Sequence, residues 1–248
     1  MELMATKQNV FLTGSAGTGK SHVIRNFLAS NPEIPALAST GAAAILISGR
    51  TFHSFFNLGI LEGGLDRTVE RALKNPKAVR RIRKAKGIII DEISMLSGAT
   101  IRTAEKIARL ARNSTSPWGG LQIIACGDFA QLPPVTRANE KTDWAFLDET
   151  WALTNFQNIL LNEVHRTKEE NFLQVLQYVR EGHVNDMVKN FLNGRILDVS
   201  DEFQGTRLFP HRATADEFNL RKLAELPGDI ISIPTEYSGN EYSIENLR

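Results

Sequence analysis

The sequence predicts an α/β fold in which a mainly parallel sheet is flanked by helices. Short apolar segments with strand character alternate with segments whose apolar residues recur at helical spacing. Residues 87–90, Gly-Ile-Ile-Ile, are continuously apolar, as expected of a parallel strand covered on both faces. A glycine-rich loop joins the first strand to the first helix. Such alternation implies βαβ units.

The predicted elements of the first two thirds of the chain follow one another in this alternating order. Residues 9–13 form a short apolar strand, and residues 21–28 a helix with an apolar side. We expect further strands at residues 36–39, 87–90 and 121–126, and further helices at residues 41–45 and 99–112.

The pattern changes beyond residue 166. We expect helices at residues 172–179, 187–192 and 214–226, and strands at residues 207–209 and 229–233. This predicts one lobe over residues 1–165, with a small insertion at about residues 57–86. Residues 166–248 then begin a second α/β lobe that has too few strands to be complete.

The composition is that of a soluble globular protein, with 42% hydrophobic and 23% charged residues in 248. No apolar run approaches the ~20 residues of a membrane span, so we expect no membrane partner. Cys126 is the one cysteine, which favours a reducing compartment. Residues 1–9 show no targeting segment. We expect an intracellular location: cytoplasm or nucleoid in a bacterium, nucleus in a eukaryote.

Charge gives only a local signal for nucleic-acid binding. The net charge is +1, so the molecule has no overall basic field. A basic run without acids comprises Lys74, Lys77, Arg80, Arg81, Arg83, Lys84 and Lys86. It fits a solvated helix face beside a strand, and it also fits contact with a phosphate backbone. The run alone does not decide between the two.

A phosphate-binding loop follows the first strand and satisfies the pattern G-x-x-x-x-G-K-[ST]. Lys20 is expected to reach the β- and γ-phosphates of ATP, and the Ser21 hydroxyl to ligate Mg²⁺. The alternative is a glycine-rich turn with an incidental lysine, which the strand–loop–helix order disfavours. The candidate nucleotide-binding residues are Gly14, Ser15, Ala16, Gly17, Thr18, Gly19, Lys20 and Ser21.

Two adjacent acids end the apolar strand at residues 87–90. Asp91 is placed to hold the Mg²⁺ shell, and Glu92 to polarise an attacking water as general base. The pair also fits a simple turn, although the upstream phosphate loop disfavours that interpretation. A base at Glu92 indicates that water attacks the phosphate and ATP is hydrolysed. A P-loop kinase would instead transfer the phosphoryl group to a small-molecule acceptor.

The loop at residues 127–134, Gly-Asp-Phe-Ala-Gln-Leu-Pro-Pro, directly follows a predicted strand. Gln131 is suited to hydrogen-bond the γ-phosphate and the attacking water, and thereby to sense intact ATP. Pro133 and Pro134 stiffen the loop that leaves the site. From the residues alone, a plain turn and a sensor loop are equally good interpretations.

These blocks occur together, in the order seen in one protein family. With residues 39–44, 51–56, 89–95, 161–166 and 180–182 and with Phe172, they resemble the Pif family of superfamily 1 DNA helicases, which are related to RecD. The resemblance covers about residues 9–226. It implies a RecA-like motor lobe that couples ATP hydrolysis to 5′→3′ movement on single-stranded DNA and to duplex unwinding. Implied partners are single-stranded DNA and duplex junctions, with a monomer favoured and roles in DNA repair, recombination and telomere maintenance.

The resemblance also assigns roles to individual residues. Gln131 resembles the residue that couples nucleotide state to DNA contact, and Arg166 the arginine that reaches the γ-phosphate from the second lobe. The path of single-stranded DNA is implied to pass Thr40, Gly41, Ala42, Thr51, His53, Ser54, Phe129 and Pro134. His53 is suited to stack on a base or to bond a phosphate, with core packing as the alternative.

The aromatic residues near these motifs are expected to serve mainly as core. Aromatic clusters and tryptophans are more often packed than exposed as binding platforms. The expectation covers Phe52, Phe55, Phe56, Trp118, Trp144 and Trp151.

Three departures from the family pattern shape the expected activity. The family usually has a glutamine-containing segment upstream of the phosphate loop that recognises adenine, but here only Gln8 precedes the loop closely, and it is too near to play that part. In the fourth motif, His165-Arg166-Thr167 stands where the family commonly has Phe-Arg-Gln. The later motifs, which supply a further arginine, are expected near Asn240 and beyond. We therefore expect these residues alone to hydrolyse ATP poorly and to unwind weakly or not at all. A non-catalytic, nucleotide-gated module that binds DNA or protein remains the alternative.

Overall fold

The computed structural model describes residues 6–59, 63–136, 140–196, 205–228, 231, 233, 234 and 236. These residues fall into two compact units, Met1–Asn193 and Gly194–Arg248. The first unit carries the sheet and the candidate site. The second contains the helix α11 (Arg212–Ala224). The boundary predicted near residue 165 concerns the lobes of a motor, which this division does not test, so it stays a prediction.

A six-stranded sheet forms the centre of the first unit, in the order β3-β2-β4-β5-β1-β6. Every pairing is parallel, with Ile89 opposite Ile124 and Phe11 opposite Ala125. The strands are β1 (Val10–Gly14), β2 (Ala36–Ala38), β3 (Arg50–Thr51), β4 (Gly87–Asp91), β5 (Gln122–Cys126) and β6 (Gln157–Leu161). The predicted α/β class is confirmed, and all strands end at the same edge of the sheet.

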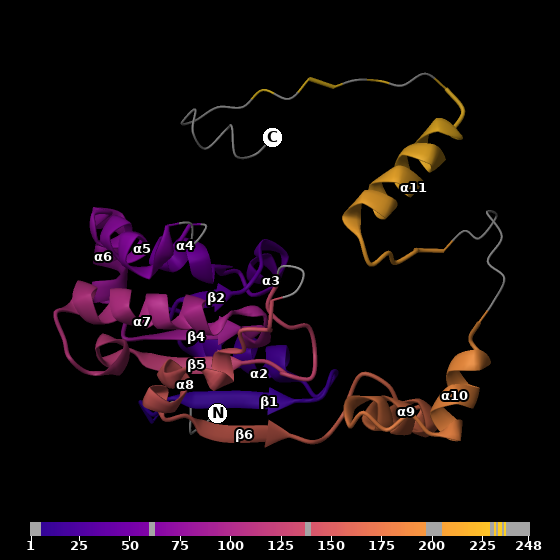
Figure 1. The fold of residues 1–248 in the computed structure, drawn as a ribbon, viewed down its shortest axis with the longest axis horizontal. Coiled ribbons are helices and arrows are strands. Elements are labelled where there is room, and N and C mark those ends of the chain that lie inside the picture. Colours follow the sequence, from indigo (N-terminus) through magenta and orange to yellow (C-terminus); the bar gives the residue numbers. More distant parts are fainter. Residues whose placement is uncertain are drawn as a thin grey trace. The chain divides into compact units, whose positions relative to one another are not determined.

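Helices cover both faces of this sheet. The helices of the first unit are α2 (Lys20–Ser30), α3 (Gly41–Leu46), α4 (Phe52–Phe56), α5 (Gly64–Leu73), α6 (Pro76–Lys84), α7 (Gly98–Arg112), α8 (Glu149–Thr154), α9 (Glu170–Arg180) and α10 (Asp186–Asn193). Helices α5, α6 and α7 lie together over one face, and α9 and α10 follow the end of β6 (Figure 1). None of the described helices is both long and apolar enough to cross a bilayer.

Alternation along β4 shows how the two faces are filled. Ile88 and Ile90 pack into the core beneath α7, whereas Ile89 packs with Ile24 and Phe27 of α2 on the other face. All three isoleucines are 0–1% exposed. Burying such a side chain stabilises the fold by roughly 1.5–3 kcal/mol. The prediction of a strand covered on both faces is confirmed.

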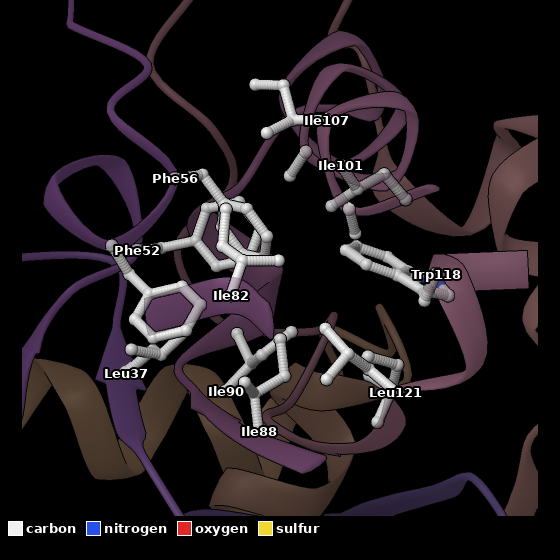
Figure 2. Packing of buried hydrophobic residues seen from close by; sticks show 14 of the residues in the cluster. Leu37, Phe52, Phe56, Ile82, Ile88, Ile90, Ile101, Ile107, Trp118 and Leu121 are labelled. Carbon is white, nitrogen blue, oxygen red and sulfur yellow. The ribbon is translucent and has the colours of Figure 1, made fainter. Parts of the chain in front are cut away.

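The aromatic residues that follow β3 complete the larger core. Phe52, Phe55 and Phe56 are at most 2% exposed, and Phe56 lies 6.1 Å from Trp118 between ring centroids. Figure 2 shows Phe52 and Phe56 facing Ile82 and the isoleucines of α7. Their predicted core role is confirmed, as is that of Trp118.

Several elements, including the short strand β3, differ from the sequence prediction. Strand β6 was not expected; its burial is only partial because it is an edge strand paired on one side by β1. Residues 207–209 are irregular rather than a strand, since no described segment pairs with them. The insertion at residues 57–86 is largely the helical pair α5 and α6. The strand predicted at residues 229–233 lies mostly outside the described residues.

Part of the basic run has a structural function. Arg81 donates hydrogen bonds to the carbonyls of Ser54 and Phe55, and Arg83 donates to Ala111 O at 2.6 Å. Lys74 pairs with Glu70. The remaining members, Lys77, Arg80, Lys84 and Lys86, are exposed. The solvated-face interpretation therefore describes only some of the run, and the contact with phosphates stays a prediction.

Candidate active site

The loop between β1 and α2 has a backbone that requires glycine. Gly17 and Gly19 adopt φ values of 82° and 86°, in the left-handed region that favours glycine. A Cβ atom on Gly17 would also lie 2.6 Å from Cβ of Arg166. His165 N donates to Gly17 O at 2.8 Å. The segment after β6 is thus held directly against the loop.

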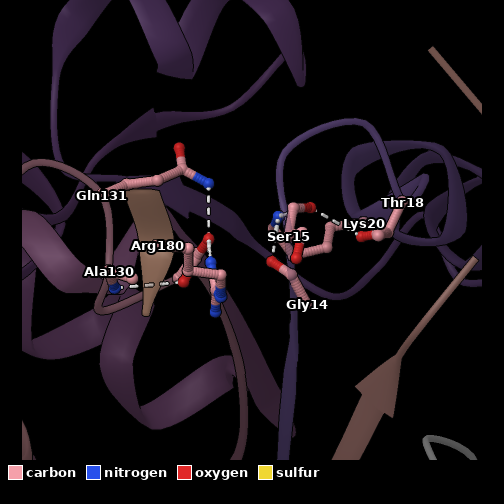
Figure 3. Close-up of polar contacts among 8 residues, drawn as sticks. Gly14, Ser15, Thr18, Lys20, Ala130, Gln131 and Arg180 are labelled. Atoms are coloured by element: carbon pink, nitrogen blue, oxygen red, sulfur yellow. Dashed lines mark hydrogen bonds and ion pairs between the residues drawn. The ribbon is translucent and has the colours of Figure 1, made fainter. Parts of the chain in front are cut away.

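Lys20, the first residue of α2, folds its side chain back over the loop. Its Nζ donates to Gly14 O at 2.8 Å and to Ser15 O at 3.0 Å, as Figure 3 shows. Thr18 Oγ1 donates to Ser15 O at 2.9 Å and closes the turn. A cation and the amino end of a helix therefore meet at one point, an arrangement suited to an anion.

The two acids at the end of β4 are held in different environments. Asp91 is 5% exposed and accepts a hydrogen bond from Glu92 N at 3.0 Å. Burial raises its pKa, with Cys126 and Lys20 acting in the opposite direction. Glu92 has a left-handed backbone, φ 53° and ψ 44°, which is unfavourable for a residue with a side chain. Burial and the neighbouring Asp91 raise its pKa.

The loop after β5 is organised around Asp128, whose side chain is 2% exposed. Its Oδ2 accepts from Gln131 Nε2 at 2.9 Å and from Arg180 of α9 in an ion pair. Its Oδ1 accepts from Ala130 N at 3.1 Å. Burial alone would raise the pKa of Asp128, but these hydrogen bonds, with that from Arg180 first, lower it overall.

One cavity of about 360 Å³ gathers the predicted catalytic residues. Lys20, Glu92, Gln131 and Arg166, which belong to four separate segments, all line it. The remaining lining residues are Ala16, Gly17, Gly19, Ser21, His22, Arg25 and His165. Asp91 is buried beside the cavity rather than in its lining. The parallel topology produces this meeting, because the ends of β1, β4, β5 and β6 share one edge.

Several residues of this region were given no role from the sequence. His22 and Arg25 lie one turn apart on α2 and line the cavity, and helical spacing could have indicated them. Arg180 is different, since its partner Asp128 is 52 residues away in the chain. No sequence signal predicts that ion pair.

The residues predicted to contact DNA at β2 and β3 lie at the same edge of the sheet. Thr40 and Thr51 are the N-caps of α3 and α4, and their hydroxyls accept from Ala43 N and Ser54 N, each at 3.2 Å. Gly41, Ala42 and Ser54 are exposed. His53 is partly exposed, and burial lowers its pKa.

The two predicted DNA contacts after β5 are less accessible. Phe129 packs in an aromatic cluster, 4.8 Å from Phe146 and 5.3 Å from Trp151 between ring centroids. Pro134 is buried. Trp144 lies 6.0 Å from Phe129. Packing accounts for all of these positions, and the DNA contacts of Phe129 and Pro134 stay predictions.

The comparison with known families agrees with this geometry. The model of the PIF1-like helicases matches residues 2–202. The chain belongs to the PIF1-like helicase family. Among curated relatives, the ATP-dependent DNA helicase Pif1 of Bdellovibrio bacteriovorus is 50% identical over all of this chain. The ATP-dependent DNA helicase PIF1 of Danio rerio is 41% identical over 89% of it.

Solved PIF1 structures share the fold. The Pif1 helicase of Candida albicans matches 93% of this chain with a TM-score of 0.83 and 36% identity. The Bacteroides Pif1 in complex with ADP-AlF3 and ssDNA matches 92% with a TM-score of 0.76 and 29% identity. The chain spans 57% of the Bdellovibrio relative, 35% of the Danio relative, and 54% and 56% of the two solved chains.

Proposed function

We propose that this chain forms the nucleotide-binding part of an ATP-dependent DNA helicase motor. It binds ATP with Mg²⁺ and couples hydrolysis to 5′→3′ movement on single-stranded DNA, as a monomer. The observation that carries the proposal is the single cavity lined by Lys20, Ser21, Glu92, Gln131 and Arg166. Membership of the PIF1-like helicases supports it.

Binding begins at the phosphate loop. The Lys20 ammonium and the backbone N–H groups at the start of α2 attract the β- and γ-phosphates. The Ser21 hydroxyl and the Asp91 carboxylate are hard oxygen donors that suit Mg²⁺, which in nucleotide sites uses few protein ligands besides phosphate oxygens. When bound, that ion neutralises charge on the phosphates.

Hydrolysis is assigned to Glu92, Gln131 and Arg166. Burial and the neighbouring Asp91 raise the pKa of Glu92, which makes its carboxylate a stronger base than that of an ordinary glutamate. Gln131 is placed to orient the attacking water beside it. Arg166 presents positive charge to the γ-phosphoryl group, whose charge must be stabilised in the transition state.

DNA is proposed to cross the loops after β2 and β3. Exposed Gly41, Ala42 and Ser54 and partly exposed His53 lie at the sheet edge that also holds the nucleotide cavity. Because the side chains of Thr40 and Thr51 are engaged as caps, these residues offer mainly backbone to DNA. The Bacteroides Pif1 complexes with ssDNA, and a solved Pif1 structure that concerns DNA unwinding at forked dsDNA, support single strands and junctions as partners.

Steady-state ATP hydrolysis, with and without a single-stranded DNA oligonucleotide, tests this function. We expect slow but DNA-stimulated turnover that Lys20→Ala abolishes and Glu92→Gln lowers by ~100-fold or more. Lys189→Ala, which removes an exposed lysine from α10 outside the cavity lining, is the matched control and should leave the rate unchanged. Nucleotide and DNA binding without turnover would instead support the non-catalytic module. Nucleotide binding that survives Lys20→Ala would contradict both functions.

A further inference from the structure

We infer that Arg180 is a positioning residue that orients the nucleotide sensor Gln131 through Asp128. The inference deepens the proposed function and rests on it. The three residues form a continuous chain of contacts from α9 to the nucleotide cavity (Figure 3). Gln131 lines that cavity, whereas neither Asp128 nor Arg180 does.

The contacts of Asp128 leave its carboxylate fully engaged. Oδ2 accepts from Arg180 and Gln131, and Oδ1 accepts from Ala130 N. The side chain of Asp128 is 2% exposed and that of Arg180 29%. A buried carboxylate is stable only when it is paired and hydrogen-bonded, so Arg180 supplies the counter-charge that keeps Asp128 ionised in place.

An ionised Asp128 fixes the orientation of the Gln131 amide. A carboxylate only accepts hydrogen bonds, so the NH₂ group of Gln131 must face it. The carbonyl oxygen of Gln131 then points away from Asp128, as Figure 3 shows. This leaves one N–H to donate to a phosphate oxygen and one oxygen to accept from a water. Both properties are those required of a γ-phosphate sensor beside Glu92.

Without Arg180 the Gln131 amide loses this orientation. Asp128 would be a buried carboxylate without a counter-ion, which favours its protonated form or a rotated side chain. A protonated carboxyl also donates, so the Gln131 amide could bind it in either orientation. We expect Arg180 to affect recognition of the γ-phosphate more than affinity for the diphosphate.

The test compares the affinities of the whole chain for Mg²⁺–AMP-PNP and for Mg²⁺–ADP. We expect the wild type to favour AMP-PNP, and Arg180→Gln to reduce that ratio about tenfold, the range of a hydrogen bond to a charged group. ADP affinity should change little. Arg180→Lys should restore part of the ratio. Arg180→Gln combined with Gln131→Ala should lower it no further than Gln131→Ala alone.

Arg109→Gln is the matched control. Arg109 pairs at 2.8 Å with Glu105, a carboxylate of α7 that is 8% exposed and lies outside the cavity lining. A merely structural role for Arg180 would lower both affinities and the melting temperature with the ratio unchanged, and would overturn the inference. So would a wild-type chain that does not discriminate the two nucleotides. Nucleotide binding that survives Lys20→Ala overturns the proposed site itself, which separates the two failures.

Discussion

Thr40 and Thr51, both proposed to line the DNA path, have side chains already used by the fold. Each hydroxyl accepts a hydrogen bond from the first turn of the helix that it caps. Such a cap contributes about 1 kcal/mol. A threonine in a binding motif can therefore be required for the backbone geometry that it sets rather than for contact with the ligand.

The ion pair of Asp128 gives a pH-dependent prediction. Its pKa is lower in the folded chain than in the unfolded chain, so its stabilisation is present above the unfolded pKa of about 3.9 and is lost as pH falls through the folded pKa. Asp128→Asn should cost roughly 1–3 kcal/mol of unfolding free energy at pH 7. The difference in unfolding free energy between the wild type and Asp128→Asn should stay constant from pH 7 to pH 5 and shrink below about pH 4. Urea titrations across this range measure it, and a pH-independent difference would contradict the assignment.

At the residue scale, local motifs were predictable and distant partners were not. Lys20 and Glu92 could be proposed from the sequence because each stands in a short motif of adjacent residues. Asp128 was visible within its loop, yet its role depends on Arg180, which tertiary packing brings from α9. The left-handed backbone at Glu92 also had no sequence signal, since only the strand end and the adjoining loop impose it.

Arg112 joins three elements through its guanidinium. It donates to Gly119 O at 2.7 Å and to Ala85 O at 2.8 Å, and it also reaches the carbonyls of Ile82 and Arg83. The last carbonyls of a helix have no partner within the helix, so Arg112 satisfies the end of α6. The sheet-covering helices α6 and α7 are thereby fixed to each other.

Arg112→Lys should destabilise the first unit although it keeps the charge. A lysine cannot reproduce the planar fork of donors, and carbonyls left without a partner cost about 1–3 kcal/mol. Arg80→Lys, at an exposed position of α6, is the control and should stay within about 0.5 kcal/mol. Chemical denaturation compares the two variants. Equal stability of the two variants would show that water replaces the hydrogen bonds that the Arg112 guanidinium donates to the carbonyls.

At the element scale, the buried strands were predicted and the edge strands were not. Strand β4 has five buried residues and a continuous apolar sequence, whereas β6 begins with Gln157 and Asn158 and is mostly exposed. Strand β3 has only two residues, too few for any periodicity. Residues 207–209 were predicted to form a strand and do not, because an apolar segment forms a strand only when a neighbouring strand supplies the hydrogen bonds.

For the whole molecule, the described residues that line the nucleotide cavity all come from the first unit. Every residue that lines it precedes Asn193, where that unit ends. A chain ending at Asn193 should bind Mg²⁺–AMP-PNP with an affinity within about twofold of the full chain, since it keeps every described residue that lines the cavity. Fluorescence titration measures this, and a tenfold loss would show that the second unit contributes to the site.

The order of motifs along the chain predicted the overall architecture because each motif ends a strand of one parallel sheet. That topology brings the phosphate loop, the paired acids, Gln131 and Arg166 to one edge. Movement along DNA depends on how many helices and strands act together, and not on one motif. The chain spans 57% of its Bdellovibrio relative, so its residues alone predict the nucleotide chemistry better than the unwinding.

The most direct test of the account measures single-stranded DNA affinity with Mg²⁺–AMP-PNP and with Mg²⁺–ADP. If the nucleotide cavity and the loops after β2 and β3 act as one motor, the two affinities should differ by roughly fivefold or more, the usual scale of such coupling. Lys20→Ala should remove the difference while leaving DNA binding intact. Equal DNA affinities in the wild-type chain, with both nucleotides bound, would contradict the account.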